Sequence, residues 1–314
     1  MKEKTLKQIA NLKNQTIGVE VEMNSITRLE AARIAAEFFG THRVENTAYR
    51  NGYSTVSAWD AQRREWKFQK DVSIAGDDAH KCEMVTPILN YSDIESLQEL
   101  CRRLRKAGAK SDATRGCGIH IHLGQGDHTP QTLRNLANIM AGHENLLAEA
   151  LKLDQRRMAR YCRTVDPRFL KELNKKKPKD MDELKDIWYT SQGENYGREQ
   201  HYNGSRYRML NLHATFTKKT IEFRLFQFDA PADGKQNGIH AGQLKSYIQL
   251  CLALSEMAKE VRTASPKPQQ HENPKFAMRT WLLRLGFIGE EFATAREILT
   301  RNLSGNAAFR FGRA

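Results

Sequence analysis

The stretch that decides the fold is Gly18-Val19-Glu20-Val21-Glu22-Met23, in which apolar and acidic residues alternate. Successive residues of a β-strand point to opposite faces of the sheet. Glu20 and Glu22 should therefore share one face, and the three apolar side chains should share the other. The sequence thus predicts a strand over residues 17–23 with one face made of carboxylates.

Three further segments repeat this alternation, each with a pair of polar residues on one face: His120 and His122, Glu222 and Arg224, and Asn211 and His213. Alone, Glu-x-Glu is common on solvated strands, and Glu-x-Arg is typical of a cross-strand ion pair. Ordinary solvent-facing strands carry a mixture of polar types. Here the residues are restricted to types that bind metals and anions. Their joint occurrence predicts a metal site on the polar face of the sheet.

Strands and helices alternate irregularly around these segments. We expect a hairpin over 53–68, a short strand over 71–74, a strand over 81–89, and strands over 206–216 and 220–228. Amphipathic periodicity and capping residues predict helices over 28–39 (capped by Thr27), 94–106 (capped by Asp93), 130–151, 241–261, 276–285 and 290–303. We expect a single catalytic domain over 1–314, with a basic helical insertion at about 154–200 and a helical C-terminal region at about 275–314.

Composition narrows the class of protein. The chain has 314 residues, 39% of them hydrophobic, and no apolar run long enough to cross a membrane. Residues 1–12 lack the apolar core of a secretory signal. The five cysteines form no CxxC pair, which favours reduced, buried thiols. We therefore expect a cytoplasmic protein. Its net charge of +13 favours acidic partners.

The donor types indicate which metal and ligand to expect. Carboxylate-rich sets suit Mg²⁺ or Mn²⁺, and a histidine donor adds tolerance for Mn²⁺. Metals held by carboxylates imply a polyphosphate ligand, whose charge Arg224 could neutralise. HExxH, a Walker A loop and a dinucleotide-binding fingerprint are all absent from the sequence.

Five segments, in order along the chain, resemble the amidoligase family of carboxylate–amine ligases, which is related to glutamate–cysteine ligase and glutamine synthetase: Gly18–Glu22, Cys82–Ile88, Gly118–His122, Asn211 with Ile221–Arg224, and Ala295–Asn306. The resemblance implies an α+β fold, in which a glutamine synthetase-like antiparallel sheet forms a half-barrel with helices packed on its outer face. It also implies the chemistry. ATP phosphorylates a carboxylate, and an amine attacks the acyl phosphate to give an amide.

The resemblance also implies roles for individual residues. The implied metal ligands are Glu20, Glu22, Glu83, His120 and Glu222. His122 would lie near the nucleotide phosphates, and Arg224 would stabilise the transferring phosphoryl group. Asn211, Arg206 and Arg208 are further contacts to substrate or phosphate, and Asp71 is a polar residue that precedes Glu83. The expected partners are ATP with Mg²⁺ or Mn²⁺, a carboxylate substrate and an amine substrate, and the charge favours an acidic peptide or protein.

Two other functions fit parts of the sequence. A metal-dependent nuclease or phosphatase would use the same carboxylates to activate water. A basic nucleic-acid-binding protein would use the cationic segment at 154–200. The second alternative leaves the faces of glutamate and histidine unexplained.

Overall fold

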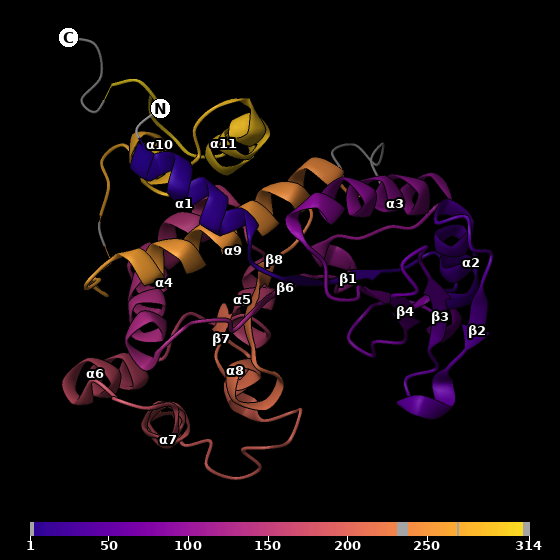
Figure 1. Ribbon diagram of the computed structural model, residues 1–314, viewed down its shortest axis with the longest axis horizontal. Coiled ribbons are helices and arrows are strands. Elements are labelled where there is room, and N and C mark those ends of the chain that lie inside the picture. Colours follow the sequence, from indigo (N-terminus) through magenta and orange to yellow (C-terminus); the bar gives the residue numbers. More distant parts are fainter. Residues whose placement is uncertain (1–2, 231–237, 269, 310–314) are drawn as a thin grey trace. The chain divides into compact units, whose positions relative to one another are not determined.

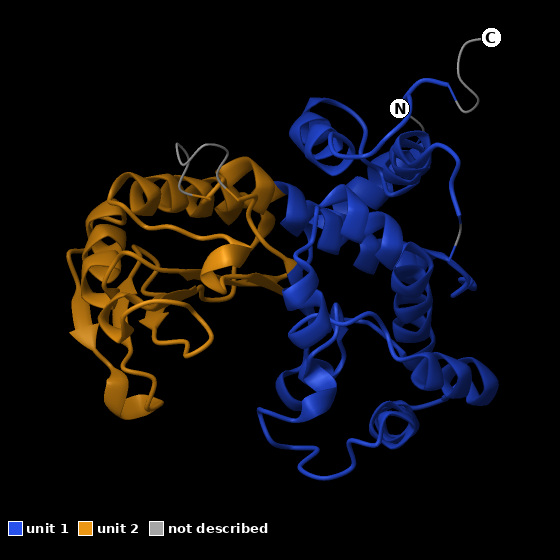
Figure 2. Ribbon diagram, turned by 180° about the vertical axis from the view of Figure 1, so that it is seen from behind, with its two compact units in different colours: residues 1–15, 123–225, 246–314 blue, residues 16–122, 226–245 orange. Residues whose placement is uncertain are grey.

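The computed structural model describes residues 3–230, 238–268 and 270–309, which fold into two compact α+β units. Unit 1 comprises residues 1–15, 123–225 and 246–314, and unit 2 comprises residues 16–122 and 226–245 (Figure 2). Among the described residues, no helix has the length and apolar character needed to cross a membrane. Residues 310–314, the end of the expected helical C-terminal region, lie outside the described residues.

Unit 2 is built on an antiparallel sheet (Figure 1). Its strands follow the order β2-β3-β4-β5-β1-β6, with these bounds: β1 (Ile17–Met23), β2 (Val44–Asn46), β3 (Val56–Trp59), β4 (Glu65–Gln69), β5 (Cys82–Val85) and β6 (Ile119–Gly124, through His122 in this unit). The predicted hairpin is β3–β4. Val19, Val21 and Ile121 are at most 1% exposed, so the apolar faces of β1 and β6 form core, as the alternation predicts.

Two helices of unit 2 support this sheet, namely α2 (Arg28–Phe38) and α3 (Ile94–Lys106). Thr27 caps α2 as predicted, because its hydroxyl accepts the N–H of Glu30 at 3.1 Å. Buried alanines line one side of α2, which packs against β3, β4 and α3. The prediction that Asp93 caps α3 is wrong. Its carboxylate instead accepts the N–H of Asn90 at 2.8 Å and closes a 3₁₀ turn, Tyr91–Asp93, before the helix.

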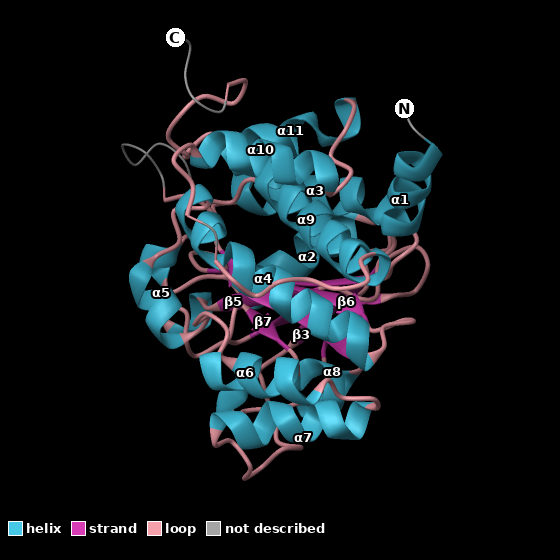
Figure 3. Cartoon of the chain, turned by 90° about the vertical axis from the view of Figure 1, so that its left-hand side faces the viewer, coloured by secondary structure: helices cyan, strands magenta, loops and turns pink. Residues whose placement is uncertain are grey.

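Unit 1 is mainly helical, with bounds α1 (Glu3–Lys13), α4 (Pro130–Ala150), α5 (Gln155–Arg160), α6 (Pro167–Lys176), α7 (Met181–Gln192), α8 (His213–Lys218), α9 (Ala241–Glu260, from Ser246 in this unit), α10 (Pro274–Arg284) and α11 (Ala293–Thr300). The expected helical character of 154–200 is confirmed by α5, α6 and α7, each capped by an aspartate: Asp154, Asp166 and Asp180. Helices α6 and α7 lie side by side (Figure 3). Helix α1 was not predicted.

Two predicted strands are wrong or too long. Residues 206–216 contain only a short strand, β7 (Leu210–Asn211), which pairs antiparallel with β8 (Thr220–Phe226). The side-chain oxygen of Asn211 accepts the N–H of His213 at 2.9 Å, which starts helix α8 where the strand was expected to continue. Asp71 and Ser73 form a turn rather than a strand, with the carboxylate of Asp71 accepting the N–H of Ser73.

Candidate active site

Three neighbouring strands of unit 2 carry the carboxylates and histidines. In the β1–β5 register, Glu22 lies directly opposite Glu83. The N–H of Glu22 donates to the carbonyl of Gly118 at 3.1 Å, which ties β1 to the start of β6. The β5–β1–β6 pairing therefore brings together, on one polar face, five of the residues predicted for the site: Glu20, Glu22, Glu83, His120 and His122.

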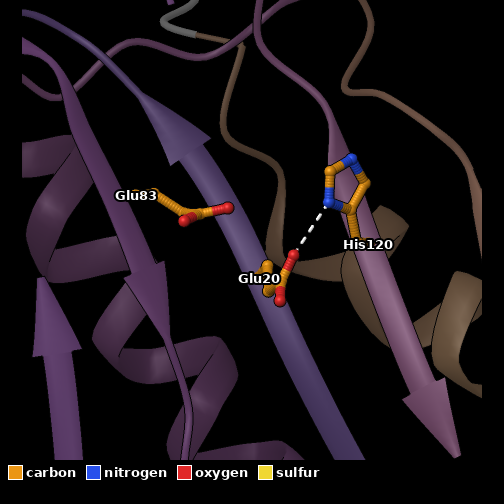
Figure 4. Close-up of side chains that lie close together, drawn as sticks. All are labelled: Glu20, Glu83 and His120. Carbon is orange, nitrogen blue, oxygen red and sulfur yellow. Dashed lines mark hydrogen bonds and ion pairs between the residues drawn. The ribbon is translucent and has the colours of Figure 1, made fainter. Parts of the chain in front are cut away.

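The side chains of Glu20, Glu83 and His120 point toward one another (Figure 4). Glu20 lies 2.9 Å from Nδ1 of His120 and 3.3 Å from Nε2 of His122. Glu20, Glu83 and His120 each offer a ligand atom, and these three atoms lie within 4.8 Å of one another. Donor atoms at that spacing can bind one ion between them, so the cluster fits a metal site.

The pKa shifts of Glu83 and Glu20 also fit a cation-binding site. Burial raises the pKa of Glu83 well above its ordinary value, and the negative charges of Glu20, Glu22 and Asp71 raise it further. Burial also acts to raise the pKa of Glu20, but the two histidines outweigh it, so this pKa lies well below the ordinary value. A bound divalent cation would offset the repulsion between the Glu83 carboxylate and these neighbouring carboxylates.

Two further residues complete the surroundings of Glu83. Gln69, across the β4–β5 pair, donates from its amide to the Glu83 carboxylate at 2.7 Å. Asp71 forms a second group of potential ligands with Glu22 and Glu83, again within 4.8 Å. Gln69 was missed in the sequence. The feature that could have identified Gln69 is its position at the end of β4, directly opposite Glu83 on β5.

Unit 1 carries a polar cluster on β7 and β8. Asn211 lies opposite Glu222 in the strand register and donates to its carboxylate at 2.5 Å. Arg224 forms an ion pair with the other oxygen of Glu222. All three residues are at most 4% exposed. The alternation on β8 therefore places Glu222 and Arg224 together as predicted, and Asn211 fixes the orientation of the carboxylate.

The remaining predicted residues lie outside that cluster. His213 begins α8 rather than sharing a strand face with Asn211, and its Nδ1 lies 2.6 Å from the hydroxyl of Tyr189. Arg206 ends a 3₁₀ turn, Gly204–Arg206. Arg208 is paired with Asp166 at 2.9 Å. The five cysteines are buried and free, as expected.

The match to a protein-family model agrees with the resemblance in the sequence. The family described as "Putative amidoligase enzyme" matches residues 13–255. A solved bifunctional glutathione synthetase from Pasteurella multocida is similar over 96% of this chain and 49% of its own, at 12% identity and a TM-score of 0.46. The chain thus spans about half the length of that protein. No curated protein matches the sequence. Because the family match covers most of its length, the chain belongs to the amidoligase family.

Proposed function

We propose that this amidoligase family member is an ATP-dependent carboxylate–amine ligase that requires Mg²⁺ or Mn²⁺. Family membership supports an amide-forming ligase. The observation that carries the metal requirement is the cluster on unit 2, where Glu20, Glu83 and His120 converge to within 4.8 Å. A half-barrel around this polar face, as in glutamine synthetase, is part of the proposal.

The residues of unit 2 fit a hard divalent cation. Carboxylate oxygens predominate, and one imidazole nitrogen joins them, which suits Mg²⁺ or Mn²⁺ better than Zn²⁺. Gln69 donates to Glu83, and the N–H of Gly118 donates to Glu22 at 2.6 Å, so both carboxylates are oriented by neighbouring groups. When bound, the metal would neutralise phosphate charge and hold the nucleotide for transfer.

Asn211, Arg224 and His122 also have proposed roles. Asn211 holds Glu222, a further proposed metal ligand, by donating to one of its oxygens. Arg224 is held by the other oxygen of Glu222 and would stabilise the phosphoryl group. His122 is proposed to lie near the nucleotide phosphates. Phosphorylation gives the substrate carboxylate a good leaving group, which the neutral amine then displaces to form the amide.

Metal binding is the first experimental test. Calorimetric titration of the purified chain with Mn²⁺ should show saturable binding that Glu20→Gln and Glu83→Gln weaken at least tenfold, because each substitution removes a charged donor. Glu45→Gln is the matched control, since Glu45 is a half-exposed residue of the same sheet, paired with Arg43. Equal affinity in all variants would contradict the metal site.

Turnover is the second test. The chain, ATP and Mg²⁺ are incubated with pools of carboxylates and amines, and mass spectrometry looks for a product lighter than its two precursors by one water. Glu222→Gln and Arg224→Gln should abolish that product, whereas Glu45→Gln should not. Phosphodiester cleavage without ATP would favour the metal-dependent nuclease instead. Tight nucleic-acid binding unaffected by these substitutions would favour the nucleic-acid-binding protein.

A further inference from the structure

Arg206 and Arg208 are two residues apart, yet the structure gives them different surroundings. Arg208 donates to the carboxylate of Asp166 at 2.9 Å, to Gln192 at 3.0 Å and to the carbonyl of Thr164 at 3.0 Å. These contacts engage all three nitrogens of its guanidinium. Arg208 therefore connects α7 to the segment before α6 and has a structural role.

The side chain of Arg206 is not neutralised in the same way. The residue is 9% exposed, and its hydrogen bond goes from Nη1 to the carbonyl of His201 at 3.0 Å. Within the described ranges of the chain, no carboxylate lies in ion-pair distance of its guanidinium. A buried cation without an anionic partner costs several kcal/mol. The fold holds Arg206 in place in spite of this cost, which an anionic ligand would offset.

Two tyrosine rings lie near this guanidinium. Its central carbon lies 5.4 Å from the ring centre of Tyr202 and 5.7 Å from that of Tyr207. The guanidinium of Arg224 lies 5.8 Å from the same Tyr207 ring. Stacked arginines keep the N–H groups at the edge of the guanidinium plane available for bidentate bonds to an oxyanion. Unit 1 therefore has two cations at one ring, and one of them, Arg224, forms an ion pair with Glu222.

The turn that carries Arg206 is fixed by its own contacts. The side-chain oxygen of Asn203 accepts the N–H of Ser205 at 3.0 Å, and the indole N–H of Trp188 donates to the Ser205 hydroxyl at 2.9 Å. Arg163 donates to the carbonyls of Gly204 and Tyr207, both at 3.4 Å. A binding residue held on a rigid turn loses little conformational entropy when its ligand arrives.

We propose that Arg206 binds an oxyanion, a carboxylate or a phosphate, at the edge of its guanidinium beside Tyr207, and that Arg208 does not. The identity of the ligand rests on the proposed function. It would be either a phosphate of the nucleotide or a second, non-reacting carboxylate of the substrate. In the latter case the enzyme would act on a substrate with at least two acidic groups.

The experiment measures anion binding by the full chain without ATP, amine or metal. Pyrophosphate and glutarate are titrated separately in EDTA, with ionic strength held constant by NaCl, and followed by calorimetry and by the midpoint of thermal unfolding. The wild type should bind at least one probe saturably. Arg206→Gln should weaken that binding about tenfold or more, because bonds to a charged donor are lost. Arg206→Lys keeps the charge but loses the planar guanidinium. Its affinity for the probe should lie between those of the wild type and Arg206→Gln.

Arg198→Gln is the matched control. Arg198 also stacks on a tyrosine, with its central carbon 5.3 Å from the Tyr189 ring centre, but it is paired with Asp186 at 2.7 Å. This variant should bind both probes as the wild type does. Arg206→Gln should unfold at an unchanged temperature without probe, since it removes one hydrogen bond together with a poorly neutralised cation.

The outcomes separate the two ligand sources. Loss of pyrophosphate binding alone identifies a nucleotide phosphate, and loss of glutarate binding alone identifies a substrate carboxylate. The inference is overturned if Arg206→Gln binds both probes as tightly as the wild type, or if the wild type binds neither saturably. Since the assay contains no ATP, amine or metal, a failure to form amides would refute the proposed function and leave this result standing.

Discussion

Glu144 offers a quantitative test of how burial controls charge in this protein. It lies on α4, is 3% exposed, and accepts the N–H of Val165 at 3.0 and 3.2 Å through its two oxygens. Burial raises the pKa of Glu144 from 4.5 to about 7, although the Val165 N–H and the charge of Arg208 both favour the ionised form. At neutral pH and above, Glu144 is therefore ionised in the folded chain, although burial makes this ionised form less favourable there than in the unfolded chain.

The sign and size of the effect follow from proton linkage. Between pH 4.5 and pH 7 the folded state keeps the Glu144 proton and the unfolded state releases it, so stability falls as pH rises. Above pH 7 both states are ionised, and the loss is complete. A shift of roughly 2.5 units corresponds to about 3 kcal/mol of unfolding free energy.

Glu144→Gln removes this titration and keeps an oxygen that can accept from Val165. Urea unfolding of the wild type and the variant is measured from pH 5 to pH 8.5. The stability of the variant relative to the wild type should increase with pH by up to about 3 kcal/mol and level off above pH 7. Glu149→Gln, on the exposed side of the same helix, should show no such trend. A stability difference between Glu144→Gln and the wild type that stays constant over the whole pH range would refute the reasoning.

Three further predictions concern other polar side chains. Gln69→Leu removes the donor to Glu83 and should weaken Mn²⁺ binding about tenfold by calorimetry; unchanged affinity would show that this bond does not orient the ligand. Arg208→Gln leaves Asp166 without this ion pair and should lower the unfolding free energy in urea by about 2–4 kcal/mol; a loss below measurement error would contradict its structural role. Burial lowers the pKa of His128 to about 4, so its imidazole NMR signals should titrate near pH 4, and a midpoint near pH 6.5 would show that the ring is accessible.

The sequence predicts most reliably what depends on neighbouring residues. Alternation along β1 and β6 places the two glutamates and the two histidines on one face, because side-chain direction in a strand depends only on position. The aspartate caps of α5, α6 and α7, which we did not predict, are equally local, since each accepts N–H groups two or three residues ahead. Information of this kind does not require knowing which strand pairs with which.

The contacts that the sequence does not predict depend on pairing between distant segments. Gln69 orients Glu83 only because β4 lies beside β5 in one particular register. Arg208 is a structural residue because Asp166, 42 positions earlier, lies within reach of it. The strand expected to reach His213 ends early because the side chain of Asn211 accepts that residue's N–H and starts a helix.

The pair Arg206 and Arg208 shows why residue type and spacing are insufficient to assign a role. Both are arginines on one short segment, and the family resemblance assigns them the same contacts. Their hydrogen-bond acceptors distinguish them. Arg208 donates to a carboxylate, an amide and a carbonyl, whereas Arg206 donates to a single carbonyl. The same criterion applies to Glu83, whose pKa is raised by burial and by three nearby carboxylates. The fold keeps the charge of Arg206 without balancing it, and it disfavours the charged form of Glu83. In both cases a ligand of opposite charge would supply the missing stabilisation.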